Sequence, residues 1–331
     1  MGSAEERNYS KVRFGHIFLQ YTYGILLKIG IIGLGDIAQK AYLPILCSKE
    51  LDLHLYTRDL EKLFRIGRQY RVQNLHQNFE SILNSGIQAA FVHTSTGSHF
   101  EIIQMLLMHN IHVYVDKPIT YNFASSKQLL ELAESRKLIL MVGFNRRYAP
   151  AYRELKQVSN PNMVIMQKNR VSLPDDTRTF ILDDFIHVVD TLSYLFPFPI
   201  KELTVKGMKK AGLLYHVVIQ MIADNGAIAM GIMNRDSGLV EERIEIFNSN
   251  EKRTVLNLSS LSVHINRDET SKTMGDWDSM LYKRGFEQII SDFLNAVKTG
   301  EKPEFTVEDS LRTHQLCEEI VKELSNAERL E

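Results

Sequence analysis

Short hydrophobic runs alternate with segments of helical periodicity in the first part of this chain. One run is centred on Ile29, Ile31 and Ile32, and others fall at residues 51–56, 87–93, 111–115 and 138–142. Helical patterns occupy residues 61–70 and 100–108 between these runs. An alternation of strand and helix predicts a parallel sheet covered by helices.

The pattern changes beyond about residue 148. Longer segments there alternate apolar and polar residues, which is typical of antiparallel strands with one buried face. We expect helices at 180–195, 286–298 and 307–324, and the pair Thr306 and Asp309 resembles a capping box that opens the last helix. The alternating segments are 163–171, 202–208, 215–222, 227–233 and 243–247.

This change divides the chain into two expected domains, residues 27–148 and 149–331, and the last helix is free to pack back on the first domain. Residues 1–26 are interpreted as a leader or extension. Basic residues precede an apolar stretch there, as in a signal peptide, but polar residues interrupt the stretch and no small-residue cleavage site follows it. We assign no targeting role to this segment.

The composition excludes several classes of protein. The 331 residues are 44% hydrophobic and 24% charged, as in an ordinary globular protein, and the net charge of −1 gives no reason to expect nucleic-acid or membrane partners. Two cysteines, Cys47 and Cys317, are too few for a zinc cluster. Their scarcity in so long a chain predicts a cytoplasmic location.

The first apolar run leads into a glycine-rich turn that is typical of a dinucleotide-binding fold. Gly33 allows a sharp turn, and Gly35 leaves room for a pyrophosphate to approach the backbone. Asp36 and Ile37 then begin a helix whose free N–H groups suit a phosphate, and the small Ala38 lets that helix pack closely on the strand. A glycine pair alone could mark any tight turn, so the prediction rests on the flanking strand and helix.

The end of the second strand carries the residues that would distinguish NAD from NADP. Arg58 can bind the 2′-phosphate of NADP, and Thr57 can donate its hydroxyl to the same group. The alternatives are that Arg58 is a solvated loop residue and that Asp59 accepts the ribose hydroxyls of NAD. We favour NADP over NAD on the arginine.

Other polar residues follow later strands of the same sheet. Because ligands of such sheets gather at the carboxyl ends of the strands, we expect these residues to line the cofactor cleft. A simpler reading of His99 is a helix-start residue, and one of the two arginines at 146 and 147 could merely join the domains. The expected cofactor-binding residues here are Thr94, Ser95, Thr96, His99, Asp116, Lys117, Asn145 and Arg146.

Two places carry candidate acid–base chemistry. Lys117, at the end of a buried strand, could hydrogen-bond a substrate hydroxyl. Asp183, His187 and Asp190 are spaced four and three apart on an otherwise apolar helix, which would align them on one face. A buried structural histidine with structural carboxylates is the simpler reading of this line. A metal site is conceivable but lacks further ligands elsewhere, so we expect none.

Taken together, these motifs resemble the Gfo/Idh/MocA oxidoreductase family, and most closely its MviM-like group. The resemblance runs in order from about residue 27 to the C-terminus. It is carried by Gly-x-Gly-x-x-Ala at the first turn, Asp-Lys-Pro at 116–118, Gly-Phe-Asn-Arg-Arg-Tyr at 143–148 and Asp-x-x-x-His-x-x-Asp at 183–190.

The resemblance implies an α/β fold, with an N-terminal Rossmann dinucleotide-binding domain and a C-terminal α/β domain built on a large, mostly antiparallel sheet. It also implies that Lys117 is the catalytic lysine, Asp183 the active-site aspartate and His187 the proton-transferring histidine. Arg146 matches a position that touches substrate or cofactor in some relatives. Many relatives form homodimers or homotetramers through the sheet. Two departures are Asp116 in place of a common glutamate and Phe185 in place of a common glycine.

The resulting hypothesis is an NAD(P)-dependent dehydrogenase or reductase that interconverts a secondary alcohol and a ketone on a sugar, polyol or related small molecule. His187 would take the hydroxyl proton while Lys117 stabilises the negative charge on the oxygen. Two alternatives are a dinucleotide-binding sensor without turnover and an enzyme that recycles its cofactor during hydrolysis or elimination.

Overall fold

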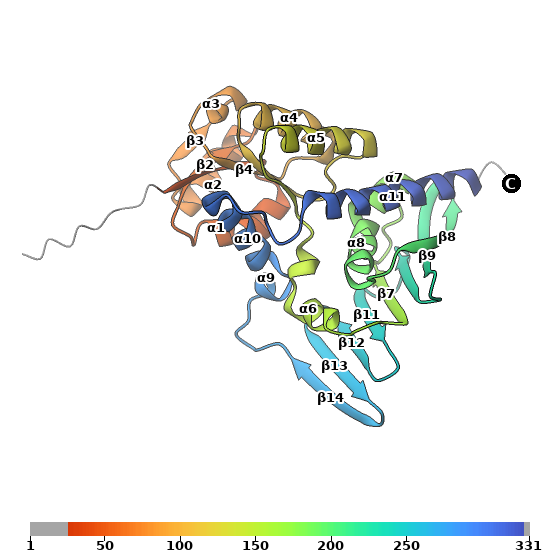
Figure 1. Ribbon diagram of the computed structural model, residues 1–331. Helices are drawn as coiled ribbons and strands as arrows, with labels where there is room; N and C mark the ends of the chain where they lie inside the picture. Colours follow the sequence, from red (N-terminus) through yellow and green to blue (C-terminus); the bar gives the residue numbers. More distant parts are fainter. Residues whose placement is uncertain (1–25, 328–331) are drawn as a thin grey trace, which may run out of the picture.

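The computed structural model describes residues 26–327, so the expected leader lies outside the described residues except for Leu26. Figure 1 shows two lobes, an upper one built on the first sheet and a lower one built on the second, with the long helix α11 (Val307–Ala327) running between them. The protein is an α/β fold of the expected class.

The first sheet contains six parallel strands in the order β3-β2-β1-β4-β5-β6. The order reverses between β1 and β4, and the crevice beside such a reversal is where open α/β sheets bind their ligands. This is the predicted Rossmann arrangement. The strands are β1 (Leu27–Ile32), β2 (Leu51–Tyr56), β3 (Asn74–His76), β4 (Ala89–Val92), β5 (His112–Val115) and β6 (Leu140–Val142).

Helices connect these parallel strands and cover both faces of the sheet (Figure 1). The first is a π-helical segment that continues into a short α-helix, with Pro44 in its first turn, where a missing N–H costs nothing. The helices of this domain are η1 (Ala38–Tyr42), α1 (Leu43–Leu46), α2 (Leu60–Tyr70), α3 (Phe79–Leu83), η2 (Thr96–Ser98), α4 (His99–Met108) and α5 (Phe123–Ser135).

The second sheet contains eight strands in the order β14-β13-β12-β11-β7-β10-β9-β8, and all of its pairs are antiparallel except β7 with β10. The sequence pattern predicted five of the strands, which are β7 (Met163–Asn169), β8 (Ile200–Lys210), β9 (Leu213–Ala223), β10 (Ile228–Asn234) and β11 (Glu241–Phe247). It missed β12 (Lys252–Leu256), β13 (Ser260–Ile265) and β14 (Asp268–Thr273). Every residue of β14 is exposed, so this strand has no apolar face to read.

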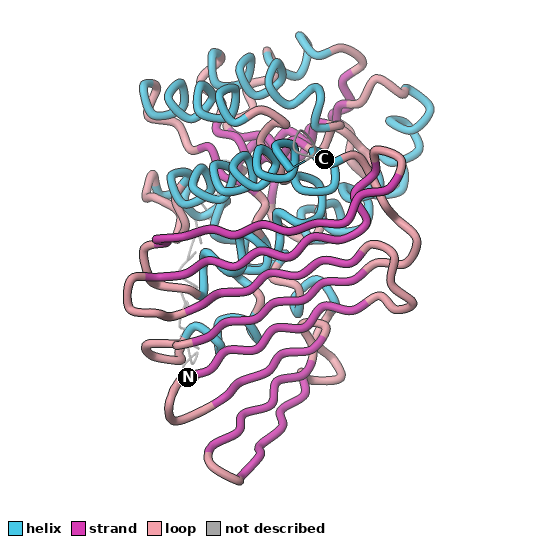
Figure 2. Tube along the Cα trace, turned by 90° about the vertical axis from the view of Figure 1, so that its right-hand side faces the viewer, coloured by secondary structure: helices cyan, strands magenta, loops and turns pink. Residues whose placement is uncertain are grey.

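One face of this sheet is covered and the other is open. The π-helix η4 (Phe180–Phe185) and α8 (Ile186–Leu195) pack on the covered face, which carries Val164, Met166 and Ile244. Figure 2 shows the other face toward the viewer, with no helix of the described residues in front of it. The short elements η3 (Asn145–Tyr148), α6 (Pro150–Lys156) and α7 (Thr177–Thr179) lie between the domains and beside the sheet.

Both C-terminal helices contact the first domain. The helix α10 (Phe286–Thr299), preceded by α9 (Met280–Lys283), buries Ile289, Ile290 and Phe293 in the same hydrophobic cluster as β1. The helix α11 packs against α5 of the first domain and α8 of the second. Its first turn has the expected cap, because the Thr306 N–H donates to Asp309 Oδ2 at 3.3 Å. Within residues 26–327 no helix combines the length and apolarity needed to cross a membrane.

Candidate functional site

The glycine turn after β1 has the geometry that a phosphate-binding turn needs. Gly33 has a φ of +89°, and a Cβ there would lie 2.7 Å from the Thr94 main-chain nitrogen, so only glycine fits. At Gly35 the nearest atom to such a Cβ is the His93 carbonyl oxygen, 3.8 Å away, which leaves the space above this residue open. A dinucleotide pyrophosphate fits this open space and would meet the N-terminus of the helix that begins at Asp36.

Buried polar atoms without partners surround the same crevice. At the carboxyl end of β4, Thr94 Oγ1 and both ring nitrogens of His93 have no hydrogen-bond partner among the described residues. Burial lowers the pKa of His93 to about 3, and its ring lies against Tyr42 with the ring centres 3.9 Å apart. Such atoms are costly unless a ligand or water bonds them, which fits a cofactor in this crevice.

His99 does not fit a direct cofactor contact. The residue is buried at the start of α4, its Nδ1 lies 3.0 Å from the Pro118 carbonyl oxygen, and its Nε2 lies 3.1 Å from that of Thr94. Both ring nitrogens therefore face main-chain carbonyls. The imidazole holds the loop after β4 to the loop after β5, which matches the simpler, structural reading of this residue.

The other residues of the loop after β4 remain accessible. Ser95 is exposed, and its carbonyl oxygen accepts the Ser98 hydroxyl at 2.8 Å, while Thr96 begins η2. The side chain of Thr96 also hydrogen-bonds Tyr121. A cofactor contact of these two residues stays a prediction.

At the end of β2, Arg58 is available to bind a cofactor, whereas the carboxylate of Asp59 is already hydrogen-bonded. Arg58 is exposed, and no side-chain hydrogen bond or ion pair joins it to another residue of the described part of the chain. Asp59 caps α2 instead, where its Oδ1 accepts the Lys62 N–H at 2.9 Å, and this bond lowers the carboxyl pKa. Thr57 is half-buried beside them.

Lys117 extends from the end of β5 toward the second domain. Its ammonium donates to the main-chain carbonyl oxygen of Asp183, in η4. The adjacent Asp116 carboxylate accepts the Lys117 N–H at 2.9 Å. Burial raises the pKa of Asp116, an effect that the positive charge of Lys117 opposes.

Asp183 joins the two domains a second time through its side chain. Its Oδ2 accepts the hydroxyl of Tyr121 at 2.9 Å, and burial, together with this contact, raises the pKa of Tyr121 to about 12. Tyr121 lies four residues beyond Lys117, and nothing in the hydrophobic pattern marked it as a site residue. The carboxylate of Asp183 thus faces Tyr121 rather than the imidazole of His187.

His187 lies one helical turn beyond Asp183, at the start of α8. Its pKa is held well below the usual value, first by burial and then by the positive charges of Arg146, Lys168 and Lys117. The imidazole is therefore neutral near pH 7 and able to accept a proton. No hydrogen bond joins its ring to another described residue.

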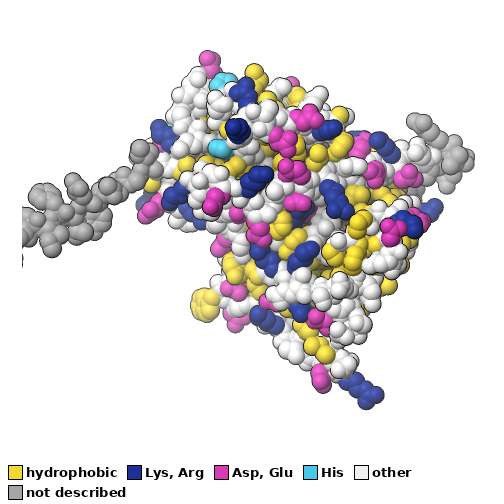
Figure 3. Space-filling view, in the orientation of Figure 1, with side chains coloured by type: hydrophobic (Ala, Val, Ile, Leu, Met, Phe, Trp, Pro, Cys, Tyr) yellow, Lys and Arg dark blue, Asp and Glu magenta, His cyan; other side chains and the backbone are white. Residues whose placement is uncertain are grey.

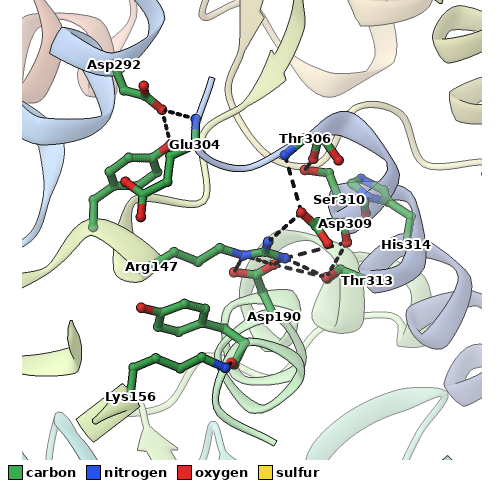
Figure 4. Close-up of polar contacts among 12 residues, drawn as sticks. Arg147, Lys156, Asp190, Asp292, Glu304, Thr306, Asp309, Ser310, Thr313 and His314 are labelled. Atoms are coloured by element: carbon green, nitrogen blue, oxygen red, sulfur yellow. Dashed lines mark hydrogen bonds and ion pairs between the residues drawn. The ribbon is translucent and has the colours of Figure 1, made fainter. Parts of the chain in front are cut away.

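Asp190, three residues beyond His187 on the same helix α8, has a structural partner. The π-helix η4 ends at Phe185, so it carries Asp183 but neither His187 nor Asp190. Asp190 points to another part of the molecule, where it accepts the Arg147 Nη2 at 2.6 Å and the Thr313 hydroxyl at 2.9 Å. Figure 4 shows this buried pair, which ties η3 and α8 to α11 and takes no part in acid–base chemistry.

The residues after β6 are largely engaged in bonds within the protein. Arg146 forms a two-pronged ion pair with Glu242 of β11, with Nε 2.8 Å from Oε1 and Nη2 2.7 Å from Oε2. Asn145 is buried, and its amide donates to the Arg284 carbonyl oxygen at 2.7 Å. These bonds join η3 to the second domain, and Arg146 also lines a cavity there.

This cavity has a volume of about 320 Å³ and opens between the two domains. Its walls come from β7, β11 and α9, and charged side chains dominate them. Asp184 binds two of these charges, since its carboxylate accepts Lys168 Nζ at 2.5 Å and Arg170 Nε at 2.9 Å. Besides Arg146 and Glu242, the lining includes Lys168, Asn169, Arg170, Glu241, Asn257 and Arg284.

Two charged residues of the cavity could have been recognised in the sequence, because they occupy positions where the strand pattern calls for apolar residues. Lys168 is in phase with the buried Val164 and Met166, and Glu242 is in phase with the buried Ile244. A charge on the buried side of an alternating strand is costly unless it is paired or functional. Charged residues that interrupt the apolar phase of a strand are therefore candidates for a site.

Comparison with known proteins gives matches over both domains. The oxidoreductase family with an NAD-binding Rossmann fold matches residues 27–144, and the YceM-like C-terminal domain matches residues 150–266. The chain is 32% identical to the oxidoreductase YceM of Salmonella typhimurium, over 89% of this chain and 97% of that protein. It is 23% identical to the myo-inositol 2-dehydrogenase of Thermotoga maritima, over 86% of this chain and 92% of that protein.

Solved structures agree with these matches. The crystal structure of the dehydrogenase MviM from Clostridium difficile is 32% identical, with a TM-score of 0.85 over 89% of this chain and 99% of that one. A Gfo/Idh/MocA family oxidoreductase from Vibrio cholerae is 30% identical, with a TM-score of 0.85 over 91% of this chain and 99% of that one.

Proposed function

Since this chain belongs to the Gfo/Idh/MocA oxidoreductase family, we propose that it is a dehydrogenase that interconverts a secondary alcohol and a ketone on a hydroxylated small molecule. A sugar or polyol is the substrate class that relatives named as inositol dehydrogenases support. A bound nicotinamide dinucleotide supplies the hydride acceptor or donor.

One observation carries the proposal: Lys117 of the first domain reaches the main chain of Asp183 in the second, one helical turn before His187. The ammonium of Lys117 donates to the Asp183 carbonyl, and His187 follows one turn later. The positive charge of Lys117 is among those that lower the pKa of His187, so the two groups lie within electrostatic reach of each other. A sensor that only binds a dinucleotide would have no need of this pair.

In the oxidising direction, neutral His187 takes the proton of the substrate hydroxyl, and Lys117 stabilises the negative charge that develops on the same oxygen. Tyr121 and the main chain of η4 hold Asp183, and Asp183 in turn holds Lys117. Asp183 acts as a positioning residue for this lysine, and its carboxylate is also available to a neighbouring substrate hydroxyl.

Absorbance of reduced cofactor in a screen of sugars and polyols, with NAD and NADP in parallel, tests this function. His187→Ala should lower kcat by about 10²–10⁴ on a substrate found in the screen, because one proton-transfer group is lost. His264→Ala, in β13 and outside the site, is the matched control and should leave kcat unchanged. Full activity of the His187 variant would end the acid–base assignment. Cofactor binding without turnover of any compound would favour the sensor, and product formation without net cofactor change would favour the recycling enzyme.

We propose NADP as the preferred cofactor. Arg58 is free for a 2′-phosphate, whereas Asp59 is engaged as a helix cap. Arg58→Ala should raise the Kd for NADP by about tenfold or more, the usual effect of losing a charged hydrogen bond, and leave that for NAD nearly unchanged. Arg71→Ala, an exposed position beyond the end of α2, serves as the control. Equal losses for both cofactors would contradict the assignment.

We also propose that the chain forms a homodimer or homotetramer through the open face of the second sheet, in the cytoplasm. Apolar side chains of adjacent strands gather on that face, which no described helix covers (Figure 2). They are Ile165, Val218, Ile222, Ile228, Met230 and Ile232. Figure 3 shows basic and acidic side chains interspersed on the visible face, which gives no support to a nucleic-acid partner.

A further inference from the structure

The charges around the cavity beside His187 do not balance. Arg146 is neutralised by Glu242, and Asp184 supplies one negative charge for both Lys168 and Arg170. The pair on Asp184 therefore retains one positive charge when Lys168 is protonated, and burial lowers the pKa of Lys168 to about 7, so this excess grows as the pH falls below that value. This excess lies on the wall of a cavity of about 320 Å³, a size that suits a small-molecule ligand.

Arg284 adds a further positive charge at the rim. It follows α9, its side chain is exposed, and no side-chain hydrogen bond or ion pair joins it to another described residue. The acidic residue on the same rim is Glu241, and the nearby Arg243 donates to Glu245 at 2.9 Å.

A third positive charge lies behind the wall. Arg235 follows β10 on the covered face of the sheet, is 5% exposed and stacks over Phe180, with its guanidinium 5.0 Å from the ring centre. Its Nε and Nη1 have no hydrogen-bond partner among the described residues, and its one ion pair, with Asp175, is 3.9 Å long. A guanidinium stays charged at all ordinary pH values, so its burial with so little compensation is costly.

These three features share one explanation. A positive potential inside a partly enclosed cavity attracts and orients an anion, and a buried charge contributes to that potential without touching the ligand. Apart from Arg146, the lining residues come from the second domain, and they include neither the glycine turn nor Arg58, so the phosphates of the cofactor do not account for them. Asp184, which binds both Lys168 and Arg170 on the cavity wall, lies three residues before His187, so the cavity adjoins the segment that carries the reacting group.

We propose that the substrate carries an acidic group, a carboxylate or a phosphate, which Arg170 and Arg284 bind while His187 acts on a hydroxyl of the same molecule. This inference rests on the proposed dehydrogenase function and narrows its substrate class from hydroxylated compounds in general to acidic ones. The side chain of Asn169, whose Oδ1 is buried and without a partner among the described residues, faces the same cavity and is suited to a hydroxyl.

Direct binding tests the inference without turnover. Malonate and inorganic phosphate serve as probes, in titration calorimetry of the full chain saturated with NADP at constant ionic strength, so that the pyrophosphate site is already filled. We expect saturable binding of at least one probe, and the probe that binds more tightly identifies the acidic group as carboxylate or phosphate. Arg284→Met should raise its Kd by about ten- to a hundredfold, the usual range for losing a charged hydrogen bond.

Arg284 is the residue of choice because its side chain has no partner to leave behind, and its carbonyl bond to Asn145 survives the change. Arg267→Met is the matched control, since Arg267 is an exposed arginine of the same domain that does not line the cavity. Absence of saturable binding, or equal binding by the Arg284 variant and the wild type, would overturn the inference.

Turnover separates this inference from the function on which it rests. Matched sets of a neutral sugar, its aldonic or uronic acid and its phosphate ester, such as D-glucose, D-gluconate, D-glucuronate and D-glucose 6-phosphate, extend the comparison to kcat/KM. Oxidation of neutral compounds as well as acidic ones, with no effect of Arg284→Met, would refute the acidic substrate and leave the dehydrogenase intact. If no compound is oxidised, the dehydrogenase proposal fails, while the binding experiment still decides on the anion site.

Discussion

The buried pair between Arg147 and Asp190 offers a direct test of how the two domains are held in register. Arg147 lies on η3 of the first domain, and Asp190 lies on α8, the helix that carries His187. The two side chains are only 5% and 2% exposed, and Thr313 of α11 donates to the same carboxylate. Figure 4 shows that these groups converge from three elements.

The substitution Asp190→Asn keeps the shape of the side chain and removes its charge. Arg147 would then be buried with only Asp309 near it, at 4.0 Å and half exposed. Removing one partner of a buried pair costs about 3–5 kcal/mol, because the remaining charge is left uncompensated. Against a total stability of about 5–15 kcal/mol, this loss is large. We also expect a lower kcat, since α8 would no longer hold His187 in place opposite Lys117.

Urea unfolding followed by far-ultraviolet circular dichroism measures the loss. The single tryptophan, Trp277, is fully exposed and would be a poor reporter. The matched control is Glu304→Gln, which breaks the Arg153–Glu304 pair of 2.6 Å, whose side chains are 40% and 46% exposed. That pair should contribute no more than about 1 kcal/mol. Equal destabilisation by the two substitutions would refute the reasoning.

Three further outcomes are expected. Gly33→Ala should lower stability strongly, because its Cβ would lie 2.7 Å from a main-chain atom. Gly35→Ala should leave the urea midpoint nearly unchanged and weaken cofactor binding, measured by fluorescence titration. The reverse order of these effects would contradict the assigned roles. The ion pair with Arg146 holds the pKa of Glu242 at about 2, below its ordinary value of 4.5, so the stability that it contributes is complete above about pH 4.5 and is lost as the pH falls toward 2. In the variant Glu242→Gln, the urea midpoint should depend less on pH over that window. A pH dependence equal to that of the wild type would argue against this role of Glu242. Met230→Asp on the open sheet face should yield monomers in light scattering, while Thr270→Asp on β14 should not; monomeric wild type would refute the proposed assembly.

The local chemistry of the sequence was enough to predict the nucleotide-binding half of the molecule. Gly33 and Gly35 are required by a positive φ and by open space above the turn, and both needs are met by residue type alone. The alternation of short buried strands with helices predicted the parallel sheet, since consecutive parallel strands need a helical crossover. The exposed β14 gave no pattern, because without a buried face there is no hydrophobic alternation.

The partners of the charged side chains were decided only by the tertiary structure. Hydrophobic periodicity reports which face of an element is buried, but it does not say what that face meets. The sequence spacing grouped Asp190 with His187, yet the positions of Arg147 and Thr313 gave it a structural task. His99 likewise meets main-chain carbonyls from a loop nineteen residues away.

What the sequence determined by itself, therefore, was the order of the elements and the turn that cradles a dinucleotide, because these depend on neighbours within a few positions. The folded chain decided that Lys117 reaches the main chain of Asp183 in the other domain, and how the charged side chains around the cavity are paired. Those properties depend on distances between residues far apart in the chain, and electrostatic interactions follow distance in space.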